Sequence, residues 1–176
     1  MKIAVDAMGG DYAPEPIVHG ACAAAAKVKG EIILVGDTEK IRKFAPSTGL
    51  PKNIHLHHTT QVVEMDEKPT EALRKKKDSS LLVCTQLVKS GEAQAMVSAG
   101  NTGAATAGSL LAWRQLQGIH RPAIATVFPN RHGRFLLLDA GASPDVEPVH
   151  MLEFAIMGRA YAEQVLGKKN PKAHLL

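Results

Sequence analysis

The sequence predicts an α/β protein of three layers, in which helices cover both faces of a mainly parallel β-sheet. Short apolar runs alternate along the 176 residues with segments of helical periodicity, which is the order that right-handed β-α-β crossovers need. The apolar content is 45% but the aromatic content only 4%. Small aliphatic side chains must therefore form the core, as they do where helices lie close against a sheet.

The first part of the chain contains two apolar runs with a helical segment between them. The run at 3–5 predicts a strand, and Pro14 and Pro16 open a helix that Gly30 ends. The unbroken apolar run at 32–35 is typical of a parallel strand that is covered on both faces. The next expected elements are a short helix at 38–44 and a weaker strand at 54–56.

The second part of the chain continues the alternation. The segment 78–80 resembles an N-cap region, and it leads a helix that Gly91 stops. A strand follows at 95–97, and Asn101 then caps a helix of small residues that runs to about Leu116. The last expected elements are strands at 124–128 and 135–138 and a helix from Pro148 to about Leu166.

We expect residues 1–176 to form a single α/β domain, because neither a repeat nor a low-complexity linker interrupts the chain. Residues 171–176 look like a strand being entered, which predicts a domain that is incomplete at its C-terminus. The chain starts directly with a strand and contains no apolar run near the roughly 20 residues that span a bilayer. A cytoplasmic protein is the expectation.

A net charge of +4 favours an acidic partner or an anionic substrate. Much of the local excess comes from the consecutive cations Arg74, Lys75, Lys76 and Lys77, for which a solvated helix end is the alternative interpretation. Cys22 and Cys84 lie in helical patterns of small apolar residues, so we interpret them as buried hydrophobic residues rather than a disulfide or a nucleophile.

Three predicted strand ends combine glycine with polar residues. Ligands of open parallel sheets bind at the C-terminal ends of the strands, so these turns are the candidate site. Their residues are Asp6, Gly9, Gly10 and Asp11 in the first turn, Ser98, Gly100, Asn101, Thr102 and Gly103 in the second, and Asp139 and Gly141 in the third.

The second turn is the most informative of the three. Gly100 and Gly103 lack side chains that would keep an anion from the backbone, and Asn101 or Thr102 can cap the helix that follows. The first amides of a helix are unpaired, so they can hold phosphate without a lysine. A capped turn without any ligand fits the spacing equally well.

Other ligand motifs are missing from the sequence. It contains neither G-x-G-x-x-G nor a P-loop nor a G-x-S-x-G elbow. His55 and His57 share one face of a strand, and Asp6 and Asp11 form an acidic pair, yet surface histidines and turn-stabilising aspartates are the commoner outcome. We expect no metal, no cofactor and no nucleic-acid partner.

Six segments resemble the PlsX-type phosphate acyltransferases, and they follow that family's order along the whole chain. The three turns read DAMGGD at 6–11, VSAGNTGA at 97–104 and LLLDAGA at 136–142. The other matches are LRKKKDSS at 73–80, GIHRP at 118–122 and FAIMG at 154–158. Two departures are a chain that stops where members continue, and Ser143 where the family commonly has Asn.

The resemblance implies an enzyme that transfers a fatty acyl group from acyl-carrier protein to inorganic phosphate. The acyl phosphate product would feed phospholipid synthesis. The resemblance also implies a fold like that of the isocitrate and isopropylmalate dehydrogenases and the phosphotransacetylases, a homodimer, and loose association with the inner face of the membrane.

Under this hypothesis each turn receives a role. The Gly100–Gly103 turn holds phosphate together with Ser98 and Thr102, and Asn101 is the candidate catalytic donor to phosphate or to the oxyanion. The other glycines and aspartates of the three turns line the same crevice, and the cations 74–77 attract the acidic carrier protein.

Three alternatives stay open. A phosphotransacetylase-like enzyme would use coenzyme A as the acyl donor, and a decarboxylating dehydrogenase would share only the fold. The chain could also be an inactive fragment or a binding module. A comparison of acyl donors, a test for reduction of a nicotinamide cofactor, and an assay of acyl phosphate formation separate the three.

Overall fold

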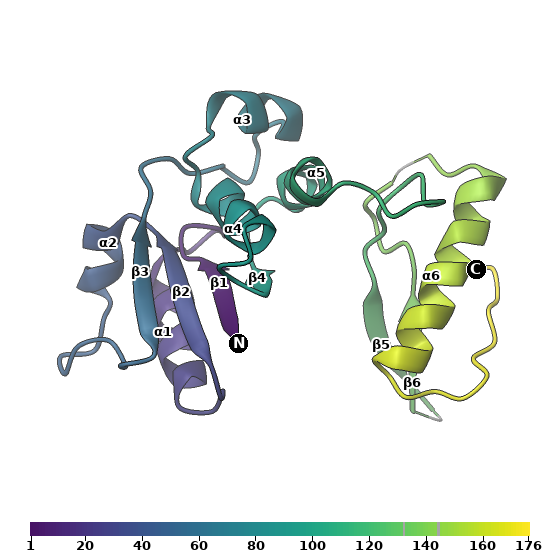
Figure 1. Ribbon diagram of the computed structural model, residues 1–176, viewed down its shortest axis with the longest axis horizontal. Coiled ribbons are helices and arrows are strands. Elements are labelled where there is room, and N and C mark those ends of the chain that lie inside the picture. The colour runs from purple at the N-terminus through teal and green to yellow at the C-terminus, as the bar shows by residue number, and fades with distance from the viewer. Residues whose placement is uncertain (132, 144) are drawn as a thin grey trace. The chain divides into compact units, whose positions relative to one another are not determined.

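The computed structural model describes residues 1–131, 133–143 and 145–176. It divides into two compact units, Met1–Arg114 and Gln115–Leu176 (Figure 1). We describe each unit by itself, and the single domain expected over 1–176 stays a prediction.

The first unit is built on a four-stranded parallel sheet in the order β3-β2-β1-β4. Its strands are β1 (Lys2–Asp6), β2 (Glu31–Gly36), β3 (Ile54–His58) and β4 (Ala95–Val97). Ile3 of β1 pairs with both Ile32 and Ala95, so β1 lies in the middle of the sheet. Because all strands run in one direction, their C-terminal ends form one edge, and the first two predicted turns meet there.

Helices cover both faces of this sheet, which confirms the three-layer prediction for the first unit. The helices are α1 (Glu15–Ala25), α2 (Thr38–Lys43), α3 (Pro69–Lys75), α4 (Ser80–Lys89) and α5 (Thr102–Trp113). On one face, Val18 of α1 and Ile41 of α2 pack with Leu34. On the other face, Cys84 of α4 packs with Val35. The helices α3 and α5 contact each other, and α5 lies beside α4 (Figure 1).

Helix α3 was not predicted from the sequence. Pro69 occupies its first turn, Glu71 is the acidic residue there, and Arg74 and Lys75 lie in its last turn. Each of these placements is favoured at the corresponding helix end, so the signal was present in the sequence. The other predicted elements of the first unit are confirmed, although α1 ends at Ala25, several residues before Gly30, and α5 ends at Trp113 rather than near Leu116.

The second unit does not continue the parallel alternation. Strands β5 (Thr126–Asn130) and β6 (Gly133–Leu137) pair antiparallel, and helix α6 (Pro148–Gln164) contacts β6. Too few residues separate the two predicted strands for a crossover helix, so they can only form a hairpin. The rings of Phe128 and Phe135 stack across it with centroids 5.6 Å apart. Among the described residues, no helix combines the length and apolar character needed to cross a membrane.

Ser79 is an N-cap residue whose hydroxyl does not cap. It precedes α4 and is fully buried, and its Oγ has no hydrogen-bond partner in the described part of the chain. Because no bond is lost, we expect Ser79→Ala to leave the free energy of unfolding unchanged or to raise it slightly. The control is Asp37→Ala, because Asp37 accepts from the amides of Glu39 and Lys40 at the start of α2 and should cost about 1 kcal/mol. Urea unfolding checks both, and equal losses would contradict the prediction.

Candidate active site

The ends of β1 and β4 are tied together by the carboxylate of Asp6, which is 2% exposed. Its Oδ1 accepts from the amide of Met8 at 3.2 Å, and its Oδ2 accepts from the Ser98 hydroxyl at 2.7 Å. The Ser98 Oγ in turn accepts from the amide of Gly100 at 3.0 Å. The first two predicted turns are therefore brought together, and the hydroxyl of Ser98 and the amide of Gly100 are already in use.

Gly9 and Gly100 allow the two turns to touch. A Cβ atom on Gly9 would lie 2.4 Å from Asp6 Oδ2 and 2.9 Å from the amide nitrogen of Gly100, and a Cβ on Gly100 would lie 3.1 Å from the Gly9 Cα. Gly10 has a φ of +114°, a conformation that glycine adopts without steric cost. Asp11, the fourth predicted residue of this turn, is exposed.

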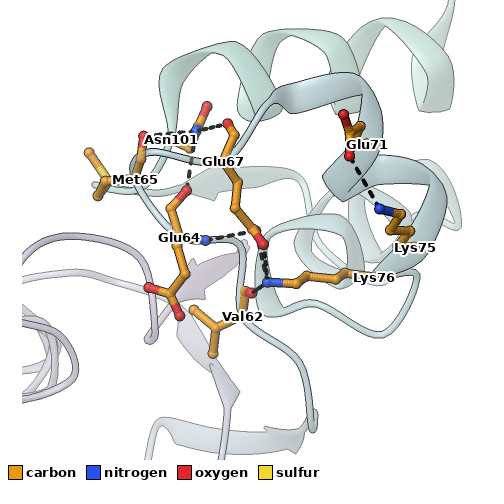
Figure 2. A network of polar contacts seen from close by, with 8 residues as sticks. All are labelled: Val62, Glu64, Met65, Glu67, Glu71, Lys75, Lys76 and Asn101. Atoms are coloured by element: carbon orange, nitrogen blue, oxygen red, sulfur yellow. Dashed lines mark hydrogen bonds and ion pairs between the residues drawn. The ribbon is translucent and has the colours of Figure 1, made fainter.

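Asn101 is the N-cap of α5, so its predicted capping role is confirmed. Its Oδ1 accepts from the amide of Ala104 at 2.9 Å. Its Nδ2 donates to the main-chain oxygens of Glu64, Met65 and Glu67 (Figure 2). An amide group carries two hydrogens, so both are engaged within the protein. Direct donation from Asn101 to a substrate stays a prediction, and it requires some of these bonds to break.

The amides of Thr102 and Gly103 are the part of the predicted cradle that stays open. Both residues are exposed at the first two positions of α5, and within the described residues their amides meet no acceptor. Pro69 bounds the turn on one side, since a Cβ on Gly103 would lie 2.6 Å from its Cγ. That this turn holds an anion stays a prediction, and Thr102 and Gly103 are the residues of the turn whose amides are left for it.

The four consecutive cations have different surroundings. Lys76 is buried on most of its side chain and lies 2.6 Å from Glu67, whose pKa it holds below the usual range through hydrogen bonding and charge, together with the amide of Glu64. Lys75 pairs with Glu71 at 3.2 Å. Arg74 and Lys77 are exposed, so they are the better candidates for contact with an acidic partner.

In the second unit, Asp139 organises its own turn. Its carboxylate accepts from the amides of Ile124 at 2.7 Å, Ala142 at 3.1 Å and Ser143 at 2.8 Å, and Gly141 has a φ of +117°. This is the turn-stabilising role of aspartate. That Asp139 and Gly141 share a crevice with residues of the first unit stays a prediction.

A close contact in the second unit joins His120, in the GIHRP segment, to Glu153 of α6. The ring Nδ1 of His120 contacts Glu153 Oε1, and the amide of His120 donates to Glu153 Oε2 at 2.9 Å. Glu153 is 4% exposed on α6. Hydrogen bonds from the His120 side chain and amide hold the pKa of Glu153 below its usual range, and charge from His150 adds to the effect. An acidic residue on the inner face of α6 was the only signal in the sequence.

This pair predicts a dependence of stability on pH. Because the folded pKa of Glu153 is lowered, its carboxylate stabilises the fold above the pKa of an unfolded glutamate, about 4.3, and this contribution disappears as pH falls through the folded pKa. We therefore expect the difference in melting temperature between the native chain and Glu153→Gln to be fully present near neutral pH and to shrink toward pH 3. Thermal unfolding followed by circular dichroism measures it, and a constant difference would contradict the prediction.

Structural surroundings are seen for His55, His58, Cys22 and Cys84. His55 lies 3.4 Å from Glu31, and His58 Nδ1 is 3.3 Å from the amide of Thr38. No group of three or more His, Cys, Asp or Glu side chains is arranged to hold a metal within 1–131, 133–143 and 145–176. Cys84 is fully buried, and burial raises the pKa of its thiol strongly. Cys22 is half-buried, and burial raises its pKa too.

Known proteins match this chain over its whole length. The family model of the fatty acid synthesis proteins matches residues 1–176. A phosphate acyltransferase of Desulfitobacterium hafniense is 54% identical over 176 residues, which are 100% of this chain and 53% of that protein. A phosphate acyltransferase of Pelotomaculum thermopropionicum is 49% identical over 176 residues, again 100% of this chain and 52% of that protein. The chain thus spans about half the length of the curated relatives it matches.

A solved structure agrees on the fold. The EutD phosphotransacetylase from Staphylococcus aureus superposes with a TM-score of 0.66 at 19% sequence identity, over 92% of this chain and 52% of that one. At this identity the likeness shows the fold alone, and it confirms the predicted α/β architecture. The resemblance seen in the six motifs is confirmed as well, since the family match extends over the whole chain: this protein belongs to the fatty acid synthesis protein family, together with relatives named phosphate acyltransferases.

Proposed function

We propose that this chain forms part of an enzyme that transfers a fatty acyl group from acyl-carrier protein to inorganic phosphate. The names of relatives that are 54% and 49% identical support acyl transfer to phosphate. The observation that carries the proposal is the open pair of amides at Thr102 and Gly103. They lie at the start of a helix, where the helix dipole also favours an anion, and the Asp6–Ser98–Gly100 contacts fix the strand end before them.

The reaction needs no nucleophilic side chain, because phosphate is itself an anionic nucleophile. One phosphate oxygen attacks the thioester carbon, the carbon–sulfur bond breaks, and the carrier leaves as its thiol after taking up a proton. Holding phosphate against the thioester contributes about 7–11 kcal/mol to lowering such a barrier, and one well-placed donor to the oxyanion about 3–4 kcal/mol. In this proposal Thr102 and Gly103 hold phosphate. The shape of the two adjoining turns is given by Asp6, Gly9 and Gly10 in the first turn and by Gly100 in the second.

The wider setting is part of the same proposal. Acyl phosphate is an activated acid that a later acyl transfer to a lipid precursor would consume, so phospholipid synthesis fits the product. A homodimer, and a cytoplasmic protein in loose contact with the inner face of the membrane, follow from the family resemblance.

One substitution tests the anion seat directly. Thr102→Pro removes one amide hydrogen at the first helical position, where proline is tolerated. Asn101 before it has φ −58° and ψ 111°, so it lies outside the α region that a following proline disfavours. A hydrogen bond to a charged acceptor contributes about 1.5–3 kcal/mol, so we expect the KM for phosphate to rise about tenfold or more in the full-length protein.

The control for that test is Thr102→Val, which keeps the amide and loses only the hydroxyl. A similar rise in both variants would assign the effect to the hydroxyl, and no change with proline would remove these amides from the site. The same assay with acyl-coenzyme A as donor distinguishes the phosphotransacetylase-like alternative. Absence of acyl phosphate with either donor would leave the binding-module interpretation.

Contact with an acidic carrier predicts a salt-dependent association rate. We expect the double substitution Arg74→Glu and Lys77→Glu to lower the rate of carrier association about tenfold at low ionic strength and less at high salt. The matched control reverses Lys27 and Lys29, two exposed lysines just after α1, and so carries the same net charge. Stopped-flow binding of acyl-carrier protein measures both, and equal slowing would mean that only the overall charge matters.

A further inference from the structure

The segment 62–67, which we call the strap, connects β3 to α3 without regular structure. Its Val63 is buried and packs with Ala72, Leu81 and Ala104, so one side of the strap belongs to the core around α5. The side chains of Glu64, Met65 and Asp66 are exposed. Pro69 follows the strap and contacts Gly103 at the proposed phosphate seat, as the 2.6 Å approach to a Cβ there indicates.

Asn101 holds the strap from the side of α5. Its Nδ2 donates to the oxygens of Glu64 at 3.2 Å, Met65 at 3.1 Å and Glu67 at 3.0 Å, as Figure 2 shows. The side chain is 7% exposed, and these carbonyl oxygens gain a buried donor that water could not replace without cost. The residue that caps α5 thereby also fixes the strap against the start of the same helix.

Lys76 holds the strap from the side of α3. Its Nζ donates to the oxygen of Val62 at 2.6 Å and to the carboxylate of Glu67 at 2.8 Å. That carboxylate also accepts from the amide of Glu64 at 3.1 Å, so one ammonium group organises both ends of the strap (Figure 2). The lysine side chain is 27% exposed, which distinguishes this contact from the surface pair of Lys75 with Glu71.

We propose that Asn101 and Lys76 are positioning residues of the phosphate seat: together they hold the strap, and with it Pro69, in the place that keeps the Thr102 and Gly103 amides open. This inference rests on the proposed function. It gives Asn101 a role other than donor to the substrate and Lys76 a role other than contact with the carrier protein. Both donors are occupied within the protein, and the strap that they hold leads directly into the residue that bounds the seat.

Two substitutions release the strap from opposite sides. Asn101→Asp keeps an oxygen that can cap α5 but turns a carboxylate oxygen toward main-chain oxygens. Lys76→Met keeps the stem of the side chain and removes the ammonium group. In the full-length protein we expect each to speed hydrogen exchange of the strap amides at least about tenfold and to raise the KM for phosphate about tenfold. The kcat at saturating phosphate and the KM for the acyl donor should change little.

Matched variants separate positioning from other roles. Lys76→Arg preserves the charge and the donors and should restore a near-normal phosphate KM. Lys75→Met removes a neighbouring lysine whose partner is Glu71 and should alter neither exchange nor the phosphate KM. Because Asn101 and Lys76 hold the same strap, the double variant Asn101→Asp with Lys76→Met should raise the KM for phosphate by less than the product of the two single effects.

Several results would overturn the inference. If Asn101→Asp raised the phosphate KM while Lys76→Met did not, Asn101 would be a direct donor. If exchange of the strap rose in both variants with an unchanged KM, the strap would serve stability alone. In that case a raised KM in Thr102→Pro would still support the proposed function, so the two failures are distinguishable.

Discussion

Replacing Gly9 by alanine is expected to destabilise the first unit by about 3 kcal/mol or more. The new Cβ would lie 2.4 Å from Asp6 Oδ2 and 2.9 Å from the main-chain nitrogen of Gly100. Overpacking of a well-packed core usually costs about 1–3 kcal/mol, and here one obstacle is backbone and the other is a carboxylate held by two hydrogen bonds. Gly9 is not among the glycines with positive φ, so the effect is steric rather than conformational.

Gly20→Ala is the matched control for this substitution. Gly20 lies inside α1, is exposed, and a Cβ built there meets nothing within 4 Å. Alanine in a helix interior is about 0.5–1 kcal/mol more favourable than glycine, so this variant should be more stable than the native chain. Urea unfolding of both variants measures the contrast. A Gly9→Ala chain within about 0.5 kcal/mol of the native one would show that the two turns are further apart in solution.

The close contact between the Gly9 turn and the Gly100 turn also explains why both turns could be located from the sequence. A strand end that combines glycine with polar residues requires close approach of backbone, and both DAMGGD and VSAGNTGA have this composition. Parallel alternation then predicts that such ends meet at one edge. The pairing of Asp6 with Ser98 across 92 residues follows from that topology, because β1 and β4 are neighbours in the sheet.

The hydrogen-bond partners of individual side chains could not be predicted in the same way. Asn101 was recognised as a cap because capping is local, and its Oδ1 does bond Ala104 three residues on. The partners of its Nδ2 lie 34 to 37 residues earlier in a segment without regular structure. No periodicity marks such a segment, so its path across the start of α5 depends on tertiary packing alone. The same holds for His120 and Glu153, which are 33 residues apart.

The basic segment at 74–77 shows that composition alone does not predict which partner each cation contacts. The four cations at 74–77 are equivalent in a count of charge, yet Lys76, which follows the last residue of α3, bonds the strap, whereas Lys75 inside α3 pairs with Glu71. Recognition of Pro69 as a helix start would have predicted the second of these contacts, because residues four apart face each other on a helix. The first depends on where the strap lies.

A double-mutant cycle on Asp6 and Ser98 is expected to give a coupling free energy of about 1.5–3 kcal/mol, the range for a hydrogen bond to a charged group. Asp6→Ala leaves the Ser98 hydroxyl and the amide of Met8 without their acceptor. Ser98→Ala leaves a buried carboxylate oxygen of Asp6 without its donor and the amide of Gly100 without its acceptor. Each single variant therefore contains orphaned polar groups, and the double variant contains fewer than their sum. Its loss of stability in urea unfolding should be smaller than the two single losses added together.

The control cycle uses Ser90 and Glu92, a second pair of serine hydroxyl and carboxylate with a similar separation of 3.0 Å at the exposed end of α4. Water replaces either partner there, so we expect coupling below about 0.5 kcal/mol. The contrast matters for function, because the Asp6–Ser98 bond is what holds the strand end immediately before the proposed phosphate seat. If both cycles were additive, the strand end would be free to move in solution, and the Thr102 and Gly103 amides would have to be ordered by phosphate itself. That ordering would reduce the affinity for phosphate, and the seat could not be called preorganised.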